Sequence, residues 1–251
     1  MVKTEDFFTF SNAVSNISEE EYQKINFLTD IFDAISRTTY QSLYIIDYHK
    51  KNFLYVSPNP LFLCGHTAEE VRGLGYMFYI NHVPIEEQTM LTDINRAGFD
   101  FFNKIPFDER IKYTISYNFH LVNGKKKTLI NHKLTPIKLT NEGRIWLAAC
   151  VVSLASREKI GDIEMRKTGE INFWRYSLKQ RRWREDNVMI LKEREKDILS
   201  LSIQGYAMTE IADQLCLSLD TIKFNKRKLF EKLDVKNISE ATAFATNHNL
   251  I

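Results

Sequence analysis

This chain of 251 residues has few cysteines, almost no net charge and no long apolar run. Its three cysteines, Cys64, Cys150 and Cys216, are far apart and lack the spacing of a zinc site or a disulfide framework, so we expect reduced thiols and no bound metal. The longest largely apolar run, residues 145–155, is too short to span a bilayer, and the N-terminus is acidic where a signal peptide would be basic. We therefore expect a cytoplasmic protein with no membrane partner.

The small net charge of +2 excludes nucleic-acid affinity that arises from a positive field over the whole surface. Residues 188–251 carry nine Lys or Arg and nine Asp or Glu, so this part of the chain is neutral as well. Affinity for DNA would have to come from local clustering of cations. The hydrophobic content of 44% allows two globular domains, each with its own core.

Three short helical patterns follow one another with almost no linker in the last quarter of the chain. The third pattern, Leu219–Leu233, places Ile222, Leu229 and Leu233 in one narrow stripe, which predicts its buried face. Ser218 stands where the N-cap of this helix belongs. This succession is typical of a helix-turn-helix.

The far side of the third helix is basic. Lys226 lies nearer the edge of the buried stripe, and the far half itself carries Asp220, Lys223, Phe224, Arg227, Lys228 and Glu231. Long cationic side chains on such a helix can reach guanine edges or phosphates in a major groove about 12 Å wide. The alternative is an ordinary solvated basic face, which is the usual meaning of a lone charge run.

The neighbouring helices complete the pattern. The second is short, and its small Ala212 lets another helix cross closely. The first, Glu193–Ile203, ends before Gly205, which can supply the left-handed backbone conformation of a helix C-terminus. Asn237 and Glu240 form a capping box that opens a fourth helix.

About sixty residues of this region resemble the LuxR/GerE-type DNA-binding domain. The resemblance is carried by residues 191–195, Leu199, Gly205, residues 210–212, Leu215, Ser218, residues 221–223, Lys232, Leu233 and Val235. It implies an all-α domain of four helices, of which the third enters the major groove of double-stranded DNA and the fourth commonly pairs two copies. It also implies that Lys223, Phe224 and Arg227 face bases. The residues that it places near phosphates are Ser218, Thr221, Lys226, Lys236 and Asn237, and Lys228 completes the expected DNA-binding set.

The sequence departs from this family at four positions. The family usually has Thr at the position of Lys192, Ser at Ala207, His at Asn225 and Arg at Ile238. Two of these differences remove a hydroxyl cap, and the last removes a cation near the phosphates. We therefore expect a lower affinity for the DNA backbone than in the family at large.

Upstream of this region the hydrophobic period changes to two, which is typical of strands. Strands are expected over residues 43–47, 53–56, 113–122, 127–138 and 144–154, with small helices and a longer helix over residues 87–102 in the middle. Asn123-Gly124 is a strong hairpin signal between the third and fourth strands. This order predicts an α+β module with an antiparallel sheet and small helices.

That order resembles a PAS domain, and residues 64–70 and 82–84 are similar to its helical middle. PAS domains often hold a ligand between sheet and helices, but this chain lacks the surroundings of the cysteine in flavin-binding light sensors. No histidine has neighbours that single it out as a haem ligand, so we expect no cofactor. The many aromatic residues of this region fit a packed core at least as well as a ligand pocket. The sequence therefore identifies no ligand-binding residues.

The expected domains are an N-terminal helical segment (1–40), a PAS-like sensor domain (41–155), a linker with a β-hairpin (156–187) and the helix-turn-helix domain (188–251). Ser18 and Glu21 open a helix that runs to about Ser36 and either packs on its own domain or pairs two chains. The hairpin, residues 171–184, either packs on a domain, relays a signal between domains or adds phosphate contacts. The phosphate contacts would come from Arg181, Arg182 and Arg184.

These patterns predict a homodimeric, DNA-binding transcription regulator whose PAS-like domain senses a small molecule or a protein. No acidic cluster of a phosphate-accepting receiver domain is present. The alternative is a PAS-like protein-interaction scaffold whose helix-turn-helix no longer binds DNA, which the neutral C-terminal domain and Ile238 favour. An enzyme is not expected, because no nucleophile and base, and no set of metal ligands, stand at usable spacing.

Overall fold

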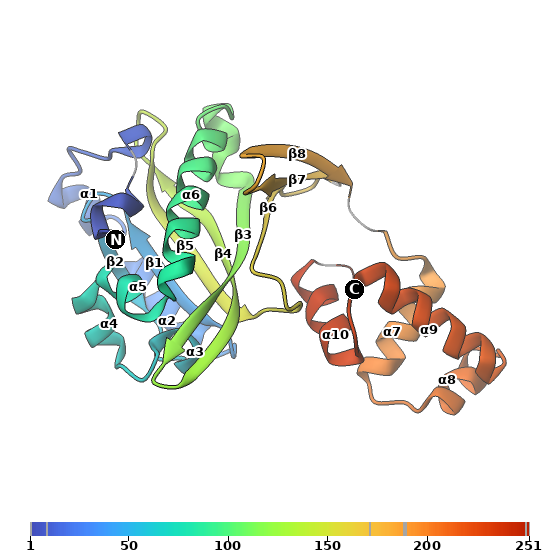
Figure 1. Ribbon diagram of the computed structural model, residues 1–251. Helices are drawn as coiled ribbons and strands as arrows, with labels where there is room; N and C mark the ends of the chain where they lie inside the picture. The colour runs from blue at the N-terminus through green and yellow to red at the C-terminus, as the bar shows by residue number, and fades with distance from the viewer. Residues whose placement is uncertain (1, 9, 171, 188–189, 249, 251) are drawn as a thin grey trace. The chain divides into compact units, whose positions relative to one another are not determined.

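The chain forms two compact units in this computed structural model, which describes residues 2–8, 10–170, 172–187, 190–248 and 250 (Figure 1). The N-terminal unit contains residues up to 154 together with Lys159–Asp186. The C-terminal unit contains the short segment Ala155–Glu158 and the residues from 187 onward. Each unit has its own core and is described by itself.

The N-terminal unit is built from one sheet and several short helices. Its helices are η1 (Thr4–Phe7), η2 (Phe10–Asn12), α1 (Glu19–Gln23), α2 (Phe27–Ser36), α3 (Pro60–Leu63), α4 (Ala68–Leu74), α5 (Met77–His82), α6 (Ile85–Phe102) and η3 (Phe107–Lys112), where η marks a 3-10 helix. Its strands are β1 (Ser42–Asp47), β2 (Asn52–Val56), β3 (Tyr113–Asn123), β4 (Lys126–Leu139), β5 (Ile145–Leu154), β6 (Gly161–Lys167), β7 (Asn172–Ser177) and β8 (Arg182–Asn187).

The strands form one sheet in the order β2-β1-β5-β4-β3-β6-β7-β8 (Figure 1). β3 and β4 pair antiparallel from Ile115 opposite Leu134 down to Asn123 opposite Lys126. The turn between them contains Gly124 at φ +57°, a conformation that glycine adopts without steric cost. The hairpin expected at Asn123-Gly124 is therefore confirmed, as are the five strands expected before residue 155.

Both faces of the central strands are covered. Tyr44 and Ile46 of β1 lie in a large core shared with α3 to α6, whereas Ile45 points to the opposite face and packs in a cluster with Trp146. Successive side chains of a strand point to opposite faces, so burial of all six β1 residues requires cover on both. Figure 1 shows α6 crossing one face of the sheet, and α2 supplies cover on the other.

The sequence predicts one helix from Ser18 to about Ser36, but the structure has two helices there, α1 and α2. The capping box is confirmed, because Ser18 Oγ accepts from Glu21 N and the Glu21 carboxylate accepts from Ser18 N. The helix breaks at residues 24–26. Tyr22 of α1 donates a hydrogen bond to Asp47 Oδ2 at 2.6 Å, and Phe32 of α2 packs on the same face of the sheet. The break between the two helices allows both side chains to contact the sheet.

Residues 159–187, which we expected to lie in a linker, add three strands to the sheet. β6 pairs antiparallel with β3, and β7 pairs with β6. The expected hairpin is present as β7 and β8, and it docks on the N-terminal unit. Trp183 Nε1 donates to Ala97 O of α6 at 3.2 Å, and its ring lies 5.1 Å from that of Phe101. The hairpin thus packs on its own domain, as one of the interpretations above predicts.

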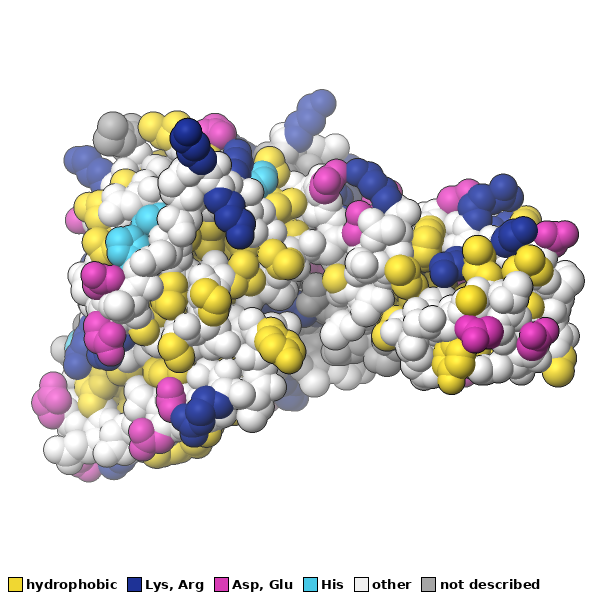
Figure 2. Space-filling view, turned by 90° about the horizontal axis from the view of Figure 1, so that it is seen from below, with side chains coloured by type: hydrophobic (Ala, Val, Ile, Leu, Met, Phe, Trp, Pro, Cys, Tyr) yellow, Lys and Arg dark blue, Asp and Glu magenta, His cyan; other side chains and the backbone are white. Residues whose placement is uncertain are grey.

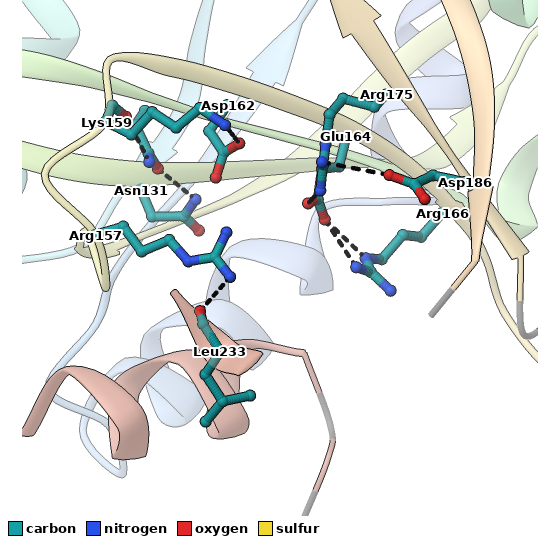
Figure 3. Close-up of polar contacts among 10 residues, drawn as sticks. Asn131, Arg157, Lys159, Asp162, Glu164, Arg166, Arg175, Asp186 and Leu233 are labelled. Atoms are coloured by element: carbon teal, nitrogen blue, oxygen red, sulfur yellow. Dashed lines mark hydrogen bonds and ion pairs between the residues drawn. The ribbon is translucent and has the colours of Figure 1, made fainter. Parts of the chain in front are cut away.

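A buried carboxylate ties the added strands together. Glu164 of β6 is only 3% exposed, and its two oxygens accept from Arg166 at 2.8 Å and from Arg175 at 3.1 Å (Figure 3). A buried charge is tolerated when it is paired and hydrogen-bonded, and two guanidinium groups satisfy both conditions.

The C-terminal unit is all-helical. It consists of α7 (Glu193–Ile203), α8 (Met208–Gln214), α9 (Leu219–Leu233) and α10 (Ile238–Asn247). The stripe expected on the third helix is fully buried there, since Ile222, Leu229 and Leu233 are each at most 1% exposed. The expected combination of an α+β PAS-like domain and an all-α helix-turn-helix domain is confirmed.

Candidate nucleic-acid interface

α9 begins and ends at defined signals. Ser218 Oγ accepts from Thr221 N at 3.2 Å, which satisfies one of the N–H groups that the first turn of a helix leaves unpaired. The helix ends at Asp234, which adopts the left-handed conformation with φ +53°. Cys216, at φ +53°, provides the sharp turn between α8 and α9, and Gly205, at φ +91°, follows the end of α7 as expected.

The apolar stripe of α9 packs against two clusters. Ile222 lies with Ile198 of α7 and with Ala212 of α8. Leu229, about two turns farther along, lies with Leu199 of α7 and with α10. The helix is therefore held near both of its ends, and its opposite face stays open.

The open face carries the three side chains expected to face bases, together with Lys228. Lys223, Phe224, Arg227 and Lys228 are all exposed, and the Phe224 ring lies under the Lys228 ammonium at 4.6 Å. Lys223 and Arg227 pair loosely with acidic neighbours on α9, at 3.7 Å and 3.8 Å. Exposed pairs of this kind contribute little free energy, so both cations can exchange them for a groove or a phosphate.

Lys226 lies between the open and buried faces, as predicted. Its side chain is half-buried and its ammonium lies 6.0 Å from the centre of the Phe230 ring. Desolvation lowers the pKa of Lys226 below its usual value. A phosphate close to this ammonium would offset that desolvation.

Two residues expected near phosphates already have partners in this unit. Lys236 Nζ lies 2.6 Å from Glu158 Oε2, and this hydrogen bond raises the pKa of Lys236. Asn237 is the N-cap of α10, with its Oδ1 accepting from Glu240 N at 2.9 Å and its Nδ2 donating to Glu240 Oε1 at 2.9 Å. A phosphate would have to compete with Glu158 for Lys236.

The segment Ala155–Glu158 was not anticipated from the sequence. Within the C-terminal unit, Arg157 donates a hydrogen bond from Nη2 to the Leu233 carbonyl at the end of α9 (Figure 3). Its guanidinium also lies 4.0 Å from the centre of the Phe244 ring of α10. No local pattern marks this residue, because its partners are 76 residues and more away in the chain.

At three of the four positions where the sequence departs from the LuxR/GerE-type pattern, other contacts replace those of the usual residue. At Lys192 and Ala207 no side-chain cap forms, but Glu195 and Glu210 still accept from the backbone N–H groups of those residues at 2.8 Å and 2.7 Å. Ile238 packs, half-buried, against the Leu229 cluster. An isoleucine thus stands where the LuxR/GerE-type pattern usually has arginine, and it contributes apolar packing.

Charges of both signs lie on the face of the C-terminal unit seen in Figure 2. Figure 2 shows Lys and Arg side chains interspersed with Asp and Glu over it, which agrees with the equal numbers of acidic and basic residues in 188–251. The basic residues of α9 thus form a local cluster on a neutral domain, as the sequence predicts.

The core of the N-terminal unit is filled by aromatic rings. The Tyr44 ring stacks on that of Phe62 with centroids 4.3 Å apart, and the Tyr44 hydroxyl hydrogen-bonds to Tyr79 and to His132 Nε2. Burial lowers the pKa of His132 to about 3, so the ring is neutral at physiological pH. The cavity left between α6 and the sheet is about 20 Å³, whereas ligand pockets usually hold about 300–1,000 Å³.

A larger cavity opens at the surface of the same unit. Its volume is about 1060 Å³, and it is lined by residues from 2–14, from the turn after β1 and from the outer side of α6. Tyr48 and Lys51 lie on one wall and Thr89 and Arg96 on another. Among the described residues, no group of three or more His, Cys, Asp or Glu side chains is placed to hold a metal ion.

Comparison with known proteins finds its strongest likeness in the C-terminal unit. Residues 189–245 match the family described as bacterial regulatory proteins, luxR family. Over 62 residues the chain is 37% identical to the response regulator protein VraR of Staphylococcus aureus and to that of Staphylococcus epidermidis. This match covers 25% of the chain, which spans only 30% of the length of either relative.

Comparison with solved structures gives matches at low sequence identity and low TM-score. The match to the phage VqmA–DPO complex has a TM-score of 0.30 at 16% identity, and it covers 92% of this chain and 90% of the VqmA chain. The VqmA dimer of Vibrio cholerae has a TM-score of 0.33 at 13% identity, with 94% and 89% covered. The PAS domain of Bordetella pertussis BvgS has a TM-score of 0.33 at 11% identity, with 54% and 88% covered. The strand and helix order described above, and not these matches, defines the fold.

None of the described helices is long and apolar enough to cross a membrane.

Proposed function

Residues 189–245 form a LuxR-type helix-turn-helix domain, and we propose that the protein uses it to bind double-stranded DNA and to regulate transcription. The observation that carries the proposal is the division of α9 into two faces. Ile222 and Leu229 fix one face in the core, while Lys223 and Arg227 project from the other. A helix presented in this way can enter the major groove. Such a function needs no catalytic group and, with DNA as partner, belongs in the cytoplasm.

The first experiment is genomic footprinting with the purified chain. A defined protected site would support the proposal, and its symmetry would report the number of chains on DNA. Binding to that site across a salt series separates the regulator from the scaffold alternative, because contacts to phosphates make affinity fall steeply with salt. The scaffold alternative gains from the pairing of Lys236 with Glu158 and from the packing of Ile238.

Lys226→Ala is expected to weaken binding to specific and scrambled duplexes by the same factor. Its half-buried ammonium lies at the edge of α9, which suits a phosphate better than a base. Removing one phosphate contact should reduce the slope of log affinity against log salt by about one unit. The measurement is fluorescence anisotropy on both duplexes from low to high salt. Lys24→Ala, which removes an exposed ammonium from the N-terminal unit, is the control, and an unchanged slope in Lys226→Ala would exclude the contact.

We propose that the protein binds DNA as a homodimer. One recognition helix contacts only a few base pairs, so two copies are needed to read a longer site. Two helices can supply the contacts: α10, by its resemblance to the family, and α2. The outward face of α2 presents Phe27, Ile31 and Ile35, which are 51%, 44% and 47% exposed and stand four residues apart. Such a stripe on one side of a helix is typical of a surface covered by a partner.

Ile31→Asp is expected to shift the chain from dimer to monomer in sedimentation velocity and to weaken operator binding. A carboxylate in the middle of the stripe would be buried without a partner in the dimer, which is strongly unfavourable. Asn26→Asp adds the same charge to an exposed residue outside the stripe and should leave the dimer intact. A dimer that survives Ile31→Asp at wild-type affinity would exclude α2 from the interface.

For the N-terminal unit we propose a sensor function. The aromatic core leaves little space inside, so the open cavity of about 1060 Å³ beside α6 is the site that we assign to a small molecule or to a segment of a protein. Thr89 and Arg96 on α6 offer a hydroxyl and a guanidinium there. Protection of α6 amides from hydrogen exchange by a candidate signal would support this assignment.

A further inference from the structure

Two histidines from different elements meet on the helical side of the N-terminal unit. His66 lies in the turn between α3 and α4, and His82 is the last residue of α5. Their Nε2 atoms are 3.0 Å apart, and their rings meet edge to face with centroids 5.0 Å apart. The two residues are 16 positions apart in the chain, so only the fold brings them together.

The other ring nitrogen of His82 is held by an acceptor. Nδ1 lies 2.8 Å from the carbonyl oxygen of Val122 on β3. A carbonyl oxygen can only accept, so Nδ1 must carry the proton of this hydrogen bond. In a neutral His82, Nε2 then presents its lone pair to His66. The Phe78 ring, whose centroid lies 4.8 Å away, keeps the imidazole in this orientation.

His66 is held less tightly than His82. Its Nδ1 lies 3.7 Å from Glu70 Oε2, which is beyond hydrogen-bond distance, but the carboxylate faces this nitrogen and can accept from it after a small approach. Glu70 is itself fixed, because the same oxygen accepts from Thr67 N at 2.7 Å in the capping box of α4. When both rings are neutral and carry their protons on Nδ1, two lone pairs face each other across 3.0 Å. A positive species between them would remove that repulsion.

We propose that His66 and His82 bind one divalent first-row transition-metal ion between their Nε2 atoms. Neutral imidazole is a common ligand for such ions, and a ligating histidine almost always donates its other N–H to a carbonyl or carboxylate. His82 meets that condition through Val122 O, and Glu70 stands 3.7 Å from His66 Nδ1 as the acceptor that a bound ion would draw on. Zinc–nitrogen bonds of about 2.0–2.1 Å in tetrahedral geometry separate two nitrogens by roughly 3.3 Å, close to the separation already present.

The pair supplies two protein ligands, and water would complete the coordination. His66 and His82 are both half-exposed, so an ion can enter from solvent and keep its waters. A closed structural zinc site has four protein ligands, so the affinity here should be lower. Between metals it should follow the order in which Cu²⁺ binds more tightly than Ni²⁺ or Zn²⁺.

The ion would tie three elements together. His66 follows Gly65, whose φ of +90° and close approach to the Asn123 side chain leave little room for a Cβ, so this turn is already seated against the β3–β4 hairpin. His82 ends α5 and bonds β3 through Val122. Metal binding would therefore fasten the α3–α4 turn and α5 to the end of the sheet. The site stands on these contacts alone and does not depend on the proposed DNA binding.

The test is calorimetric titration of the full chain with Zn²⁺ after treatment with EDTA. We expect one ion per chain, and His82→Gln or His66→Gln should weaken binding by at least about tenfold. Glu70→Gln keeps an acceptor for the α4 cap but loses the charge beside His66, and loss of such a second partner typically costs about 10–100-fold in metal affinity. His49→Gln and Glu69→Gln remove a histidine and a carboxylate outside the pair and should bind as the wild type does.

Nitrogen chemical shifts supply a readout that altered folding would not mimic. On addition of Zn²⁺, the Nε2 resonances of both histidines should move together while both Nδ1 atoms stay protonated. Melting temperatures of the variants in EDTA should equal that of the wild type. If the wild type binds no Zn²⁺ up to about 1 mM, or if His82→Gln binds it equally well, the proposal is overturned, and the two rings share a proton instead.

Discussion

Arg227→Ala should abolish most of the sequence discrimination of the protein while leaving it folded. Arg227 projects from the open face of α9, about two and a half turns after the N-cap Ser218, and its only described ion pair is the loose one with Glu231 at 3.8 Å. A guanidinium that forms two hydrogen bonds to a guanine contributes roughly 1–3 kcal/mol of discrimination, which is about a 5- to 150-fold change in affinity. Lys223→Ala should lose less, because an ammonium lacks this planar two-pronged geometry.

The measurement is the ratio of affinities for the footprinted site and for a scrambled duplex of equal length. Thermal melting is the control, since a surface substitution away from caps and cores usually changes stability by no more than about 0.5 kcal/mol. If folded Arg227→Ala kept both full affinity and full specificity, α9 would not read bases through this residue. The scaffold interpretation would then be favoured.

Leu229→Ala should unfold the C-terminal unit at a much lower temperature without affecting the N-terminal unit. Leu229 is 1% exposed and packs with Leu199, Leu233 and Ala245 in a cluster of their own. Truncating a fully buried leucine typically costs about 2–5 kcal/mol. For a domain of this size each kcal/mol lowers the melting temperature by roughly 4–8 °C, so a drop of at least about 10 °C is expected. Affinity for DNA should fall with it.

Differential scanning calorimetry checks this prediction, because two cores should give two transitions. Ile203→Ala is the matched control: it also removes apolar volume from the C-terminal unit, but Ile203 is 39% exposed and should matter little. Truncation of Leu229 should shift one transition only. An equal shift of both transitions would contradict the division into two independent cores.

The sequence alone determined the features that depend on neighbouring residues. The bounds of α9 and α7 were predicted as they stand, and so were the caps at Ser18, Ser218 and Asn237. In each cap a side-chain oxygen bonds a backbone N–H three residues away, so the signal is contained in four consecutive residues. The hydrophobic period identifies the buried face of a helix or strand for the same reason, since it reports on local geometry.

The same reasoning explains the prediction of the DNA-binding face. Once Ile222 and Leu229 are assigned to the core, helical geometry alone puts Lys223 and Arg227 on the open side. What the sequence could not supply was the state of Lys236. Its partner Glu158 lies 78 residues earlier, so its engagement depends on a segment that no local pattern connects with α10.

Only the tertiary structure decided which surfaces meet. The hairpin of residues 171–184 was expected from the sequence, but β6 was not. Its pairing with the free edge of β3 has no local signal, because a strand edge offers the same N–H and C=O groups to any neighbour. The apolar residues of α2 likewise gave no indication that Phe32 would face the sheet and Ile31 the solvent. The meeting of His66 with His82 has the same origin. Such contacts join residues far apart in the chain, so they are selected by the packing of the whole domain, which short-range spacing does not encode.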